Sequence, residues 1–197
     1  TTDARRAPWS STVASSVITA SAPVVANGLS SAVPVDPSTA TALRVLVSGL
    51  TAAPGNTAVK GVTGSPGMQT AGVSFNATVD LVDSFYNLVP STTMPNVRVS
   101  VEDPFGSGPA PATLAAGAGV FPVTLQKANA VGWKVIASTT ASSALTVAFS
   151  STPVIVTQAA AASKLLAIAN GLTVVQGSIA GVSGTPSAAT AGLASPV

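Results

Sequence analysis

Apolar and polar residues alternate along the middle of this chain. From Gly72 onward the residues Val73, Phe75, Ala77, Val79 and Leu81 are apolar, and Ser74, Asn76, Thr78 and Asp80 stand between them. A period of two is the pattern of a strand that buries one face and exposes the other. The same pattern predicts further strands at 96–103, 119–126 and 132–139. In 143–157 it places Leu145, Val147 and Phe149 on one face, followed by a break and then the apolar run 154–156.

Turn signals separate the predicted strands, and helical periodicity is nearly absent. Short strands divided by turns predict an all-β fold, an antiparallel β-sandwich. Pro122 lies inside one strand, and because proline has no N–H to donate, that strand should lie at a sheet edge or carry a bulge. We expect the core to contain Val45, Phe75, Val79, Leu81, Val99, Val101, Val123, Leu125, Trp133, Val135 and Leu145.

An internal repeat divides the chain. Residues 41–72 recur in altered form at 163–192, two residues shorter, so 163–170 should form a strand as 41–49 does. At the other end, 12–20 resembles 139–147 and 22–25 resembles 152–155. We therefore predict a leading strand segment (1–40), a complete sandwich (41–158) and a partial second repeat (159–197).

The composition argues against most chemistry. Charged residues make up 7% of the chain, the net charge is +2, and there is no His or Cys. Nucleic-acid binding would need clustered Lys and Arg, and the usual general bases, thiol nucleophiles and zinc ligands are missing. The longest apolar run, 159–175, is interrupted and shorter than a membrane span. We expect no enzyme, no cofactor, no nucleic-acid partner and no membrane insertion.

Asp83 and Asn87 form the most motif-like polar pair. They are weak candidates for a Ca²⁺ site, since carboxylate and amide oxygens are the ligands that this ion takes. The favoured interpretation is an Asx turn, in which Asp83 accepts backbone N–H groups and Asn87 adopts a left-handed conformation. The sequence around these two residues carries few further carboxylates.

Aromatic residues are few, so each one is informative. Trp133 is a candidate for stacking on a sugar, but it alternates with Val135 and Ala137, which favours packing between the sheets. Tyr86 lies in a turn and should be exposed, where it is a candidate for stacking on a sugar. Trp9 lies in the leading segment and is the best candidate for an anchor between subunits.

Several segments resemble the bacterial immunoglobulin-like (Big-type) tandem-repeat domains. These are "QTAGVSFNATVDLVDSFYN", "VRVSVEDP", "GVFPVTLQKANAVGWKVIAST" and "LTVAF", within about 43–156, with a partial recurrence at 165–192. The resemblance implies an immunoglobulin-like sandwich of a secreted or cell-surface protein. Such modules serve as spacers, adhesins, lattice proteins and enzyme appendages, so the resemblance does not choose among functions.

The repeat pattern suggests a function through its incomplete units. Unpaired strands with apolar faces recruit other chains, and head-to-tail contacts produce open filaments or lattices. We expect a structural extracellular subunit that self-assembles into a filament, sheath or surface layer; the alternative is an adhesin, carbohydrate-binding or spacer module from a tandem array, with glycans as possible partners. The candidate interface residues are Trp9, Val13, Val17, Ile18, Val24, Val25, Leu165, Ile168, Leu172 and Val174.

Overall fold

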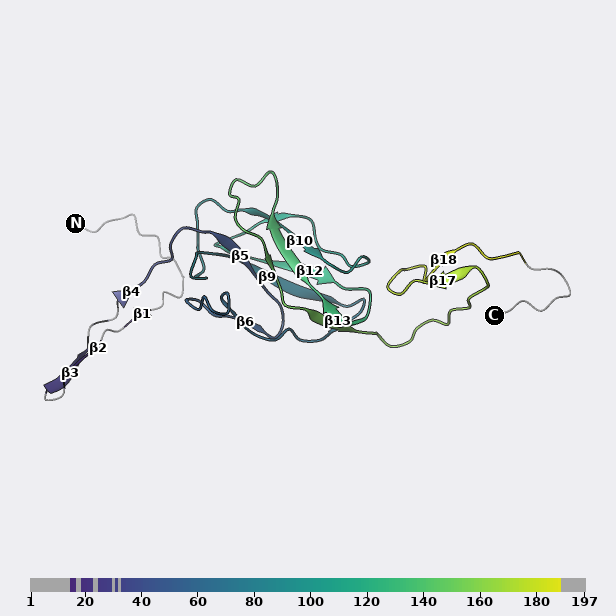
Figure 1. The fold of residues 1–197 in the computed structure, drawn as a ribbon. Helices are drawn as coiled ribbons and strands as arrows, with labels where there is room; N and C mark the ends of the chain where they lie inside the picture. Colours follow the sequence, from purple (N-terminus) through teal and green to yellow (C-terminus); the bar gives the residue numbers. More distant parts are fainter. Residues whose placement is uncertain (1–14, 17–18, 23–24, 30, 32, 189–197) are drawn as a thin grey trace.

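The computed structural model describes residues 15–16, 19–22, 25–29, 31 and 33–188, and these contain strands but no helix. Most of the strands lie in a central body, with a two-stranded ribbon beyond one end and a separate hairpin beyond the other (Figure 1). The all-β fold and its antiparallel sheets confirm the sandwich predicted from the alternating pattern.

Four sheets build the central body, namely a hairpin of β6 (Leu50–Ala52) and β7 (Val62–Gly64) and three larger sheets. The first has the order β11 (Ala112–Thr113), β10 (Asn96–Val101), β14 (Val135–Thr139), β15 (Ser150–Ser151). The second has the order β12 (Ala118–Thr124), β9 (Ser74–Val82), β5 (Ala42–Leu46). The third has the order β13 (Asn129–Trp133), β16 (Ile155–Gln158), β8 (Gln69–Thr70). Among these neighbours only β16 and β8 run parallel.

A single apolar core lies between the sheets. Seven of the eleven predicted core residues are buried, namely Val45, Val79, Leu81, Val99, Val123, Leu125 and Val135. The other four are half-buried and pack against this core, namely Phe75, Val101, Trp133 and Leu145. Leu43, Val97, Phe121 and Ile155 also belong to this core.

Three side chains break the predicted alternation. Val73 is 55% exposed, because it lies before the first residue of β9. Asp80, expected to face solvent, is buried because β9 is covered on both faces at this end, and it pairs with a buried arginine. Phe149, expected to lie on the same face as Leu145, is 69% exposed. The chain crosses between sheets at Phe149, because Ala148 bridges β5 and Ser150 pairs with β14, so the alternation is interrupted there.

Pro122 lies at a sheet edge, as its missing N–H predicts. It occupies the middle of β12, opposite Asn76, and β12 is the outermost strand of its sheet.

The leading segment doubles back on itself. β1 (Ser15–Ser16) pairs antiparallel with β4 (Val33–Pro34), and β2 (Thr19–Ala22) pairs with β3 (Val25–Leu29). This differs from the expectation of one strand equivalent to 139–155, because each of these strands pairs with another strand of the same segment. Val25 lies opposite Ala22 in this ribbon, whereas Trp9, Val13, Val17, Ile18 and Val24 lie outside the described residues.

Candidate functional site

The second repeat contains a copy of a hairpin in the first. In the first repeat, β6 (Leu50–Ala52) pairs with β7 (Val62–Gly64). In the second, β17 (Leu172–Val174) pairs with β18 (Val182–Gly184). Leu50 lies opposite Gly64 as Leu172 lies opposite Gly184, so the two-residue shortening falls in the connecting loop.

The two hairpins share their backbone hydrogen bonds. The N–H of Gly67 donates to Ser48 over 2.7 Å, and the N–H of Ser187 donates to Asn170 over 2.7 Å. Further matched donors and acceptors are Leu50 to Val47, Ala53 to Gly61, Leu172 to Ala169 and Val175 to Gly181. The repeat seen in the sequence is therefore a repeat of structure.

Glycine is required at the base of both hairpins. A Cβ on Gly64 would lie 2.3 Å from the carbonyl oxygen of Gly49, and one on Gly184 would lie 2.4 Å from that of Gly171. Both residues also have positive φ angles, 90° and 101°, which L side chains rarely adopt. The same local requirement is met by the same residue type in both copies.

The strand that precedes the first hairpin has no counterpart in the second repeat. Residues 159–169 form no strand, which corrects the expectation for 163–170. Leu43 in β5 is 2% exposed, whereas Leu165 at the equivalent position is 103% exposed. Leu166 and Ile168 are also exposed.

The difference follows from the available partners. β5 pairs antiparallel with β9, and Ala42 forms a parallel bridge with Ala148 on its other side. Within the described ranges, 164–168 has neither neighbour, and a single strand leaves its N–H and C=O groups unpaired. Of the predicted interface residues, Leu165, Ile168 and Val174 are exposed and Leu172 is half-buried. The apolar segment 164–168 is therefore the leading candidate for an interaction site.

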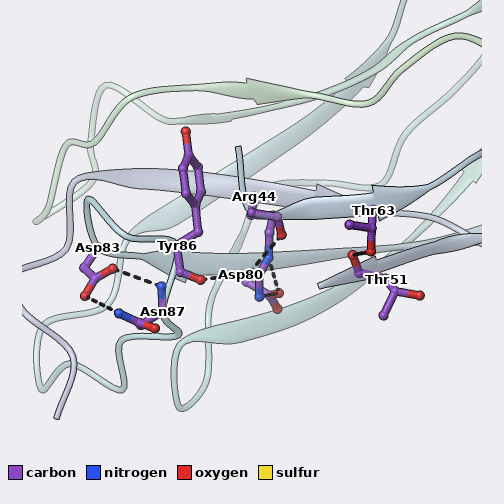
Figure 2. A network of polar contacts seen from close by, with 8 residues as sticks. Arg44, Thr51, Thr63, Asp80, Asp83, Tyr86 and Asn87 are labelled. Atoms are coloured by element: carbon purple, nitrogen blue, oxygen red, sulfur yellow. Dashed lines mark hydrogen bonds and ion pairs between the residues drawn. The ribbon is translucent and has the colours of Figure 1, made fainter. Parts of the chain in front are cut away.

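A buried ion pair lies under the first hairpin, and the strand pattern did not reveal it. Arg44 on β5 donates to Asp80 on β9 at 2.6 Å through Nη2 and at 3.1 Å through Nε. Its Nη1 donates to the carbonyl oxygen of Tyr86 at 2.9 Å (Figure 2). An arginine within the apolar run "ALRVLV" was the only signal in the sequence.

Asp83 holds a turn with both carboxylate oxygens. Its Oδ1 accepts the backbone N–H groups of Phe85 and Asn87, and its Oδ2 accepts the N–H of Ser38 and the side-chain amide of Asn87. This is the arrangement of an Asx turn. The residue with positive φ is Tyr86 (62°) rather than Asn87, which corrects that detail.

The electrostatics of Asp83 follow from these contacts. Burial acts to raise its pKa, but the hydrogen bonds from Ser38, Asn87 and Phe85 outweigh burial and hold the pKa below its ordinary value. In the part of the chain that the structure describes, no group of three or more acidic, His or Cys side chains is placed to hold a metal ion.

The aromatic residues lie in two surroundings. Trp133 is half-buried, and its indole Nε1 donates to the carbonyl oxygen of Lys127 at 2.9 Å. Tyr86 is half-buried rather than exposed, and with Phe149 it lines a cleft of about 490 Å³. Lys60, Ser150 and Ser151 also line this cleft.

No family model matches the sequence, and neither does any curated protein. In the described residues, no helix has the length and apolar character that crossing a membrane requires.

Proposed function

We propose that this chain is a structural, non-enzymatic protein that associates end to end with copies of itself outside the cell or at the cell surface. The observation that carries the proposal is the exposed apolar segment 164–168, whose equivalent in the first repeat is the buried strand β5. The proposed immunoglobulin-like classification rests on the Big-type resemblance of 43–156.

The sandwich itself suggests the pairing between copies. Ala148 bridges Ala42 in parallel, and the leading residues 12–20 resemble 139–147, which precede Ala148. Ser21 in the leading segment is equivalent to Ala148, and Lys164 in the second repeat is equivalent to Ala42. The leading ribbon of one copy therefore adds in parallel to 164–168 of the next copy, with Ser21 opposite Lys164. β2 pairs only with β3 in the described part, so it has a second edge for this strand addition.

The polar groups support a structural role. Arg44, Asp80 and Asp83 are buried and bonded to one another or to the backbone, and Asp103 accepts three backbone N–H groups. These groups stabilise turns and sheet contacts, and they leave little capacity for acid–base chemistry.

Proline substitution in the full chain tests the end-to-end contact. Ala167→Pro places a residue without an N–H inside the pairing segment, where no intrachain strand is disturbed. Ala160→Pro is the matched control in the same irregular stretch. By sedimentation and electron microscopy, the unaltered chain and the control should form ordered fibres or sheets, and Ala167→Pro should stay monomeric. A monomeric unaltered chain, or assembly of Ala167→Pro, would refute the proposal.

A second candidate, glycan binding, is favoured by the cleft beside Tyr86. Phe149 is 69% exposed there, next to hydroxyl groups of Ser150 and Ser151, and aromatic faces with a few polar groups suit sugar rings. Phe149→Ala should abolish binding on a glycan array, while Phe85→Ala, an exposed phenylalanine outside the cleft, should not. Absence of any glycan bound by the unaltered chain would exclude this candidate.

A further inference from the structure

The turn of the second hairpin contacts the sandwich through a glycine. An ideal Cβ on Gly177 would lie 2.7 Å from Cβ and 3.0 Å from Cα of Lys127, and 2.9 Å from Cδ2 of Phe105. The atoms of Lys127 lie at or next to the backbone, so they have little freedom to move aside. The tip of the yellow hairpin faces the end of the sandwich in Figure 1.

The equivalent turn of the first repeat has no such contact. Gly55 corresponds to Gly177 and has a similar φ angle, 77° against 85°. A Cβ on Gly55 would have nothing within 4 Å, and Gly55 is exposed. The backbone geometry of the turn is therefore shared, and the packing is what distinguishes Gly177.

The surface that Gly177 contacts is rigidly built. The buried carboxylate of Asp103 accepts the N–H groups of Phe105 (3.0 Å), Gln126 (2.6 Å) and Lys127 (2.8 Å). The indole of Trp133 donates to the carbonyl oxygen of Lys127 from the other side. These bonds hold two loops of the sandwich together, so the surface is already shaped to receive a partner.

We infer that the surface of Phe105 and Lys127 is a docking site for the glycine turn of the following repeat, occupied in this chain by 175–178. The contact fixes the β17–β18 hairpin on the sandwich, so the hairpin does not move freely at the end of the linking segment 159–169. It also sets where the exposed segment 164–168 is presented. The inference is independent of the proposed end-to-end association, since it concerns one chain.

Hydrogen exchange on the full chain, at a concentration where it is monomeric, tests the inference. Gly177→Ala should raise the exchange rate of amides in 172–184 and in 125–127 by about tenfold, because both sides of the contact open. Gly55→Ala imposes a similar backbone strain with no steric contact at its Cβ, so 172–184 and 125–127 should keep their rates. Any effect of strain alone would appear in 50–64 of the control.

A second variant changes a residue on the sandwich side of the contact. Phe105→Ala leaves the hairpin sequence unchanged, and it should raise exchange in 172–184 by several-fold. If neither variant changed exchange on the opposite side of the contact, or if 172–184 exchanged as fast as an unfolded peptide in the unaltered chain, the docking site would be refuted.

Discussion

The two repeats share a hairpin and differ in the strand before it. The first hairpin follows β5, a strand between β9 and Ala148 whose Leu43 and Val45 are buried. The second hairpin follows 159–169, which is irregular and exposed. The glycines and backbone hydrogen bonds of the hairpins nevertheless match.

The comparison separates what is encoded locally from what is not. A hairpin is made by residues a few positions apart, so its glycines and turn bonds are enough to reproduce it. A single strand has no internal hydrogen bonds, and it persists only where another strand pairs with it. β5 has such partners in β9 and Ala148, and within the described residues 164–168 has none.

The largest expected effect comes from replacing Arg44 in the first repeat with the residue type at the equivalent position of the second repeat. The equivalent residue is Leu166, so Arg44→Leu leaves the Asp80 carboxylate buried and unpaired, at a cost of about 3–5 kcal/mol in the free energy of unfolding. Arg98→Leu, the same change at an exposed position on β10, is the control in urea unfolding. The double variant Arg44→Leu/Asp80→Val should recover most of the loss. Equal costs for Arg44→Leu and Arg98→Leu would contradict a stabilising role for the pair.

The same substitution at equivalent leucines measures the difference between the repeats directly. Leu43→Ala should lower the free energy of unfolding by about 2–5 kcal/mol, because it opens a cavity in the core. Leu165→Ala should change it by less than about 0.5 kcal/mol in the monomer, because that side chain is exposed. A large loss for Leu165→Ala in dilute solution would show that Leu165 is buried within its own chain, contrary to the structure.

Alanine at Gly64 or Gly184 should strain each hairpin in the same way, but only the change at Gly64 should lower the stability of the sandwich. Gly64→Ala should lower the free energy of unfolding by at least about 1–2 kcal/mol, the cost of a left-handed alanine, because the added Cβ also meets the carbonyl oxygen of Gly49 and the hairpin belongs to the sandwich. Gly184→Ala should leave the urea midpoint of the sandwich unchanged and speed exchange of the Val175 amide, which bonds within the second hairpin. A shift of the sandwich midpoint with Gly184→Ala would mean that the two hairpins unfold together with it.

The smallest effect concerns Asp83, in the turn that follows β9. Because the folded-state pKa is lowered, its contribution to stability is full above the unfolded pKa of about 3.9 and is lost as pH falls through the folded value. Asp83→Asn should therefore flatten the decline in urea midpoint below about pH 4, whereas exposed Asp36→Asn should not. Profiles that decline identically for the unaltered chain and Asp83→Asn would show that other carboxylates govern acid unfolding.

The pattern of apolar residues predicted the sandwich because alternation depends on neighbours in the sequence. Val97, Val99 and Leu125 are buried as their alternation requires, and Pro122 lies at an edge because of its own chemistry. The recurrence of 41–72 at 163–192 could also be recognised from the sequence alone.

What the sequence did not reveal depends on residues far apart in the chain. The alternation predicted that Asp80 faces solvent, but Asp80 is buried and pairs with Arg44 on another strand. Phe149 is exposed because its neighbours join two different sheets, and alternation within one segment carries no sign of that crossing. The contact of Gly177 with Lys127 likewise depends on how the second repeat packs on the first.

Pro122 has a consequence for crowding. A row of free amide groups along an outer strand lets sheets from separate molecules merge side by side into an aggregate. β12 offers a gap in that row at its centre, since Pro122 has no amide hydrogen for an incoming strand. Close packing of copies along this edge therefore does not lead to merging of sheets through β12.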